Sequence, residues 1–113
     1  MFSAIREKRF AKSVVRKLLK SYSAVIANKP TLSGEPLYRE VILHTKLVDP
    51  ALVDDILWQA EDSVDEWTTD SSKGLGLRQV AHFVAYSQYL GAGNLGTVIS
   101  FKEVVYSMIP AEL

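Results

Sequence analysis

The stretch SAIREKRFAKSVVRKLLKSYSAVIA, Ser3 to Ala27, decides the fold because its apolar and basic side chains separate at helical spacing. At about 100° per residue, one side of a helix collects the apolar side chains, which are Phe10, Ala11, Val14, Val15, Leu18, Leu19, Tyr22, Val25 and Ile26. The opposite side collects basic side chains, which are Arg9, Lys12, Arg16, Lys17 and Lys20. The pattern predicts one long amphipathic helix over residues 3–27, with its apolar side against the rest of the protein.

Outward from this segment, capping signals mark two further helices beyond a loop that contains prolines and a glycine. Ser33 can cap a helix over residues 35–47, although the apolar spacing of this segment also fits a strand. Asp49 followed by Pro50 is typical of a helix start, because proline fits the first helical position. This dipeptide predicts a helix over residues 50–68.

Two more helices are expected in the carboxyl-terminal half. Residues 75–90 are apolar on nearly all sides, which predicts the most buried helix, and Gly91 is placed to end it. Ser100 and Glu103 have the spacing of a capping box for a final helix over residues 101–109.

The composition fits these elements. A chain of 113 residues that is 48% hydrophobic and 23% charged is typical of one globular domain. The absence of cysteine excludes disulfide frameworks and cysteine-ligated metal sites. No apolar run approaches the roughly 18 residues of a membrane span, and the first residues lack the apolar core of a secretory signal. We therefore expect an all-α fold, a small single-domain bundle of four to five helices over residues 1–113, located in the cytoplasm.

A net charge of zero conceals a division into two blocks of opposite sign. Residues 1–29 carry eight basic side chains and one acidic side chain, whereas residues 49–70 carry eight acidic side chains and no basic one. Such asymmetry indicates how a protein associates rather than how it folds. The two blocks could attract each other within one chain or between two copies.

Trp58 is predicted to lie within the acidic side of the helix over residues 50–68. Asp54 and Asp62 come one helical turn before and after it. A tryptophan among carboxylates is typical of an anchor for a basic partner, since its ring attracts cations and adds apolar contact. The alternative is that Trp58 packs against a neighbouring helix of its own fold.

The stretch GAGNLG, Gly91 to Gly96, resembles the Rossmann dinucleotide-binding fingerprint in the spacing of Gly91, Gly93 and Gly96. That fingerprint lies between a strand and a helix, and a second strand follows with an acidic residue about 20 positions on. Here the preceding segment is predicted to be helical, and only 17 residues follow Gly96. We therefore expect no nicotinamide or flavin cofactor, and interpret the glycines as a helix end and a loop.

Candidate catalytic residues are few. The two histidines, His44 and His82, lie on different predicted helices, and their spacing indicates no metal site. Arg78, His82 and Tyr86 recur at helical spacing and could line a pocket in which His82 acts as a base. No nucleophile can be placed beside them, so we assign no catalytic residue, metal or cofactor.

These observations favour a non-enzymatic protein-interaction module that uses charge-sorted helical faces. Its expected partner is another protein or a second copy of itself. One alternative is a peripheral membrane or nucleic-acid adaptor acting through the basic helix over residues 3–27, because both surfaces attract lysine and arginine. A second alternative is a small ligand-binding protein or enzyme that uses the row of Arg78, His82 and Tyr86.

Overall fold

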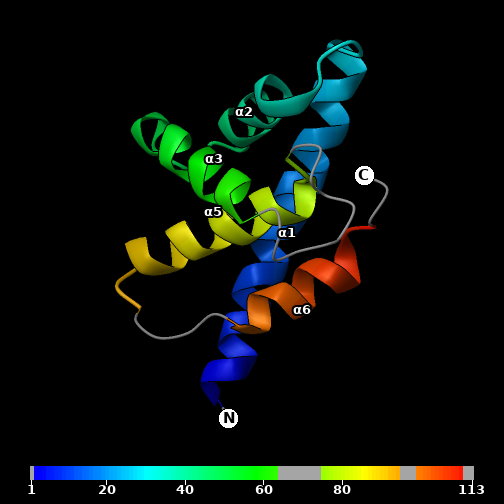
Figure 1. Ribbon diagram of the computed structural model, residues 1–113. Helices are drawn as coiled ribbons and strands as arrows, with labels where there is room; N and C mark the ends of the chain where they lie inside the picture. Colours follow the sequence, from blue (N-terminus) through cyan, green and yellow to red (C-terminus); the bar gives the residue numbers. More distant parts are fainter. Residues whose placement is uncertain (1, 64–74, 95–98, 111–113) are drawn as a thin grey trace.

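The protein is all-α in the residues that its structure, a computed structural model, describes: 2–63, 75–94 and 99–110 (Figure 1). The elements in chain order are α1 (Phe2–Asn28), α2 (Gly34–Thr45), the short 3-10 helix η1 (Pro50–Leu52), α3 (Val53–Asp62), α5 (Leu77–Gly91) and α6 (Ile99–Met108). The prediction of a small all-α bundle is confirmed.

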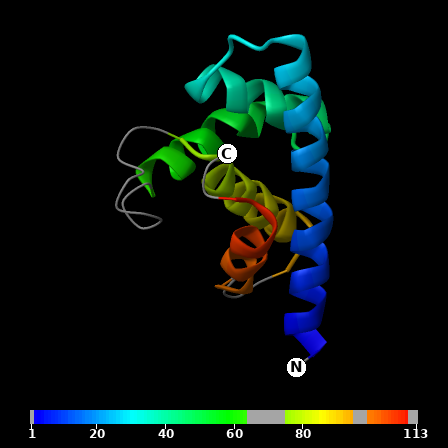
Figure 2. The same ribbon diagram turned by 90° about the vertical axis from the view of Figure 1, so that its right-hand side faces the viewer.

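The long helix α1 forms one side of the molecule, and the other helices lie on the opposite side of it (Figure 2). Its 27 residues correspond to a length of about 40 Å. α2 packs against its carboxyl-terminal end, α5 crosses its middle, and α6 packs toward its amino-terminal half. One face of α1 is therefore covered along its length, while the other face is left to solvent.

The covered face of α1 is the apolar stripe that the sequence predicts. Ala11, Val15 and Leu18 are fully buried, and Val14 and Val25 are nearly so. The remaining apolar positions of the stripe contribute partly buried side chains, namely Phe10, Leu19, Tyr22 and Ile26. This burial stabilises the bundle, because each buried aliphatic side chain contributes about 1.5–3 kcal/mol relative to an exposed one.

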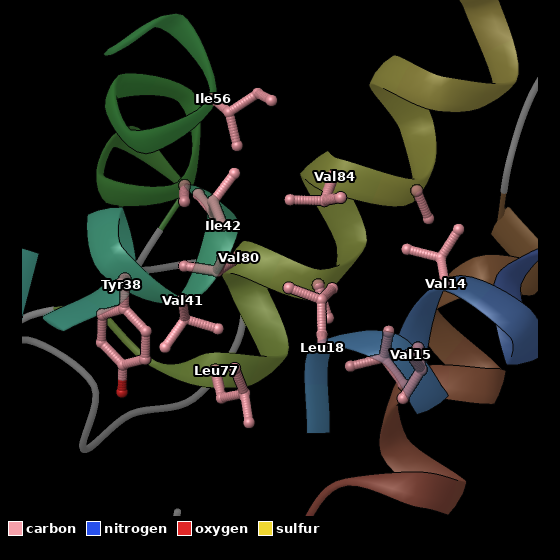
Figure 3. Packing of buried hydrophobic residues seen from close by; sticks show 14 of the residues in the cluster. Val14, Val15, Leu18, Tyr38, Val41, Ile42, Ile56, Leu77, Val80 and Val84 are labelled. Carbon is pink, nitrogen blue, oxygen red and sulfur yellow. The ribbon is translucent and has the colours of Figure 1, made fainter. Parts of the chain in front are cut away.

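Helix α5 is the central element, as its apolar composition predicts. It packs against α1, α2, α3 and α6. Its side chains at Leu77, Val80, Ala81, Val84 and Ala85 are completely buried. Side chains of α1, α2 and α3 meet around Val80 and Val84 (Figure 3).

The segment that could have been a strand is the helix α2. Ser33 is the N-cap residue, as predicted, and its backbone is extended, but its side chain makes no capping hydrogen bond. The helix ends at Thr45, and the φ of 56° at the next residue, Lys46, lies in the left-handed region. The next loop leads directly into η1 and α3, so α2 and α3 form a helical hairpin.

The Asp49-Pro50 signal is confirmed, with a difference in the helix type. The Oδ1 atom of Asp49 accepts a hydrogen bond from the Ala51 backbone N–H at 3.0 Å. The first turn is 3-10, and the α-helix proper begins at Val53. Residues 64–68 of the predicted helix lie outside the described residues.

The predicted start of the last helix is wrong. Ser100 was expected to cap the helix from outside, but α6 already includes Ile99 and Ser100. A helical Ser100 cannot occupy the cap position, which requires extended backbone. The predicted end is close to the observed one, because α6 stops at Met108, two residues before Pro110.

We expect the substitution Leu18→Ala to lower the free energy of unfolding by about 2–5 kcal/mol, because it leaves a cavity where α1 meets the core. Leu18 is fully buried. The control Ser13→Ala changes an exposed position of the same helix, and should alter stability by no more than about 0.5 kcal/mol. Urea unfolding followed by circular dichroism measures both. Equal stability of the two variants would show that α1 is not the packing surface described above.

Candidate functional site

The basic face of α1 consists of Arg9, Lys12, Arg16, Lys17 and Lys20. All five side chains are exposed. They lie on the side of α1 opposite its buried stripe, away from the other helices that the structure describes. None of them forms an ion pair with another residue in the described part of the chain. The basic face is therefore a set of exposed cations that no described residue compensates.

Two other basic residues of the same region, Lys8 and Lys29, form ion pairs within the fold. The Nζ atom of Lys8 lies 3.3 Å from a carboxylate oxygen of Glu103 on α6. The Nζ atom of Lys29 lies 3.3 Å from a carboxylate oxygen of Glu40 on α2. These contacts border the basic face and leave its five cations facing outward.

An apolar side chain accompanies the basic face. Ile5 is 49% exposed. Helical spacing places it on the same side as Arg9, Lys12 and Arg16, which are four, seven and eleven positions further on. The basic face therefore offers an apolar contact at its amino-terminal end as well as positive charge.

The Trp58 face of α3 is the second charged surface, and it consists of Asp54, Asp55, Trp58, Glu61 and Asp62. Trp58 is 68% exposed, more than any other large hydrophobic side chain that the structure describes. The opposite side of α3 packs into the core through Val53, Ile56, Leu57 and Ala60. The alternative that Trp58 packs within its own fold is therefore wrong.

One carboxylate of the Trp58 face is already compensated. The Nη1 atom of Arg39 lies 2.6 Å from Oδ1 of Asp54, and its Nη2 atom donates to Oε1 of Glu35 at 2.7 Å. The hydrogen bonds to Glu35 and Asp54 raise the pKa of Arg39. Asp55, Glu61 and Asp62 form no ion pair within the described ranges. They supply the uncompensated negative charge of this face.

The two charged faces do not meet within one molecule. α3 packs mainly on α2 and α5, whereas α1 packs on α2, α5 and α6. No ion pair between described residues joins α1 to α3. The attraction that the sequence allowed within one chain is therefore not formed between these two faces.

Of the row of Arg78, His82 and Tyr86, Arg78 joins α5 to the end of α6. Arg78 donates from Nε to the Ile109 carbonyl at 2.6 Å, and its guanidinium lies 4.4 Å from the Tyr106 ring centroid. The hydrogen bond from Arg78 satisfies the Ile109 carbonyl, which lies just after the end of α6. A positive charge at this end of a helix also stabilises the helix. Tyr86 is partly buried against the core.

His82 is partly buried, with its ring edge-on to Phe83 at a centroid distance of 4.9 Å. Burial, helped by the nearby charge of Lys102, lowers the pKa of His82 to about 4. A histidine with this pKa is a weak proton acceptor at neutral pH, which does not favour its use as a general base.

Sequence reasoning missed a contact between Ser21 and His44. The Oγ atom of Ser21 and the Nδ1 atom of His44 lie 2.8 Å apart in a hydrogen bond. Ser21 is only 4% exposed and lies inside α1. The backbone N–H groups inside a helix are used in helical hydrogen bonds and cannot stabilise an oxyanion. The pair therefore links α1 to α2 rather than forming a nucleophile with its base.

The glycine motif ends a helix, but at a different glycine from the predicted one. Gly91 is the last helical residue of α5, whereas Gly93 has a φ of 85°. The Gly93 N–H donates to the Leu90 carbonyl at 2.9 Å, and the Asn94 N–H donates to the Tyr89 carbonyl at 3.3 Å. This pair of bonds is the Schellman pattern, in which a left-handed glycine closes the helix. Gly96 lies outside the described residues.

Among the described residues, no three histidine, cysteine or carboxylate side chains come together in a group that could hold a metal ion. Within those residues, no helix combines the length and the apolar character that a bilayer crossing requires.

Comparison with known proteins gives no relative from which a role could be transferred. Neither the protein-family models, nor the curated proteins, nor the solved structures contain a match to this chain.

Gly91, the last residue of α5, and Gly93, just after it, provide a matched test of the helix-end interpretation. Gly93→Ala should lower the free energy of unfolding by about 1 kcal/mol, because a Cβ atom disfavours the left-handed backbone. Gly91→Ala should be neutral or stabilise by up to about 1 kcal/mol, since alanine favours helix. An added Cβ atom has open space at both positions. Thermal unfolding compares the two variants, and a larger loss at Gly91 would contradict the interpretation.

The lowered pKa of His82 predicts a loss of stability in mild acid. In the unfolded chain His82 takes up a proton near pH 6.5, whereas in the folded chain it does so only near pH 4. Protonation therefore favours the unfolded state as the pH falls from about 6.5 to about 4. Relative to the wild type, His82→Gln should lose about 2 kcal/mol less of its stability between pH 7 and pH 4.5. Urea unfolding at both pH values measures the difference, and an identical loss in both proteins would exclude this role for His82.

Proposed function

We propose that this chain is a non-enzymatic interaction module that binds an acidic surface of another protein through the basic face of α1. The observation that carries the proposal is the set of five exposed cations that no described residue compensates. Like charges four residues apart on a helix repel each other, as Lys12 with Arg16 and Arg16 with Lys20 do. Binding of an acidic partner relieves this repulsion, and the relief adds to the favourable free energy of binding.

The shape of the molecule supports the same role. α1 lies at one side of the bundle and presents the basic face along a straight helix (Figure 2). The buried stripe of α1 holds this helix in place, so little conformational entropy has to be lost when a partner docks. Electrostatic complementarity of this kind determines partner choice and association rate more than it determines affinity.

An anionic membrane surface is the second candidate, and the exposure of Ile5 favours it. A basic helix that carries apolar side chains on its polar side can bury them between headgroups while its lysines meet the lipid phosphates. Ile5 is half exposed beside Arg9 and Lys12. Sedimentation with anionic vesicles distinguishes binding to a membrane from binding to a protein.

The test compares Arg16→Glu with Lys46→Glu, which change the net charge equally. Both residues are exposed, but only Arg16 belongs to the basic face. Wild-type protein should bind poly-L-glutamate at low salt, and Arg16→Glu should weaken this binding about tenfold. Lys46→Glu should change it by less than about twofold, because its charge lies elsewhere. Fluorescence anisotropy measures the binding.

Equal weakening by the two variants would show that overall charge, not the basic face, attracts the acidic probe, and would contradict the proposal. Sedimentation with phosphatidylserine vesicles tests the second candidate. Tighter binding to vesicles than to poly-L-glutamate, together with loss of vesicle binding in Ile5→Asn, would favour the membrane surface instead.

A further inference from the structure

Trp58 makes the acidic side of α3 more than a solvated charged surface. Four carboxylates surround it at three- and four-residue spacing, namely Asp54, Asp55, Glu61 and Asp62. An indole that is 68% exposed leaves a large apolar area in water, which docking would remove. An indole face also attracts a lysine or arginine cation. The Trp58 face therefore fits a basic partner that also offers an apolar contact.

We propose that the Trp58 face of one copy docks on the basic face of α1 of a second copy. This inference rests on the proposed function, because it uses the same basic face as the acid-binding surface. The argument is charge complementarity: five uncompensated cations on α1 face outward, and Asp55, Glu61 and Asp62 on α3 carry uncompensated negative charge. Ile5 offers the apolar contact that an exposed indole requires.

The two faces also match in length. Arg9 to Lys20 spans eleven residues, which is about 16 Å of helix, and Asp54 to Asp62 spans eight, which is about 12 Å. One helix laid along the other therefore brings most charges of both faces within reach of a partner. Such a contact is weak and salt-sensitive, because each exposed ion pair contributes little.

The placement of the faces requires a second molecule. α1 and α3 pack on different helices, and Figure 2 shows α1 at one side with α3 extending away from it. A contact between two different faces joins copies either reciprocally in a two-fold dimer or head to tail in a longer chain. In both arrangements the average mass should rise with concentration above that of the monomer.

The experiment uses full-length chains in sedimentation equilibrium from about 10 µM to about 1 mM, the range in which weak contacts dissociate. The basic face is reversed by Lys12→Glu, Arg16→Glu and Lys20→Glu, which leave Arg9 and Lys17 against three carboxylates. The Trp58 face is reversed by Asp55→Lys with Asp62→Lys, because Asp54 is already paired with Arg39 and only Glu61 then opposes the two lysines. Each reversed protein alone carries two faces of the same sign and should stay monomeric. An equimolar mixture pairs faces of opposite sign and should associate again. Trp58→Ala keeps the charges and should weaken self-association about tenfold.

Three results would overturn the inference. One is a wild-type protein that stays monomeric throughout this range at low salt. Another is association that survives either reversal, and the third is a mixture that stays monomeric while circular dichroism shows both variants folded. If the wild type is monomeric but still binds poly-L-glutamate through Arg16, the self-association inference fails alone. If that binding is also absent, the proposed function fails as well.

Discussion

The structure depends on the burial of a single side of α1. Ala11, Val15 and Leu18 are fully buried, and α2, α5 and α6 pack on the side of α1 that carries them. Burying an unpaired cation costs far more than exposing it, so the lysines and arginines of this helix must lie on the other side. The same constraint thus builds the core and produces the outward basic face.

An aromatic cluster fixes the rotation of α1 at its amino-terminal half. The Phe10 ring lies 5.7 Å from that of Tyr89 on α5 and 6.1 Å from that of Phe101 on α6. Tyr89 and Phe101 meet edge to face at 5.4 Å, and the Tyr89 hydroxyl donates to Glu7 at 3.2 Å. Aromatic pairs in such geometries add stability beyond the area they bury. A rotated α1 would break these contacts, so the cluster also keeps the basic face directed outward.

Features that depend on local spacing could be predicted from the sequence. α1 could be predicted because its apolar period continues over many turns, and Asp49 could be recognised as a cap because it acts on a backbone N–H two residues away. The helix end could be placed only approximately. The sequence has the same residue type at Gly91 and Gly93, so it does not tell which of them ends the helix. The backbone torsion, which tertiary packing influences, shows that Gly93 takes the left-handed conformation.

Features that depend on how helices face each other could not be predicted. Arg39 compensates Asp54, and Ser21 meets His44, across helix pairs whose relative rotation no local spacing reveals. The exposure of Trp58 has the same origin. Its angle on α3 is visible in the sequence, but whether a neighbouring helix covers that angle is decided by α2 and α5, which pack elsewhere on α3.

The compensation of Asp54 by Arg39 has a consequence for recognition. It stabilises the contact between α2 and α3 with one carboxylate and leaves the other charges of α3 on either side of an exposed indole. At physiological ionic strength, exposed charges interact over only about 8 Å, so neither face attracts a partner strongly from a distance. In the proposed contact between copies, binding would therefore come from direct contact along the helices, where the apolar area of Trp58 and Ile5 would add to the ion pairs. On this proposal, complementary charge would select the surfaces that meet, and the burial of Trp58 and Ile5 would slow the dissociation of the contact.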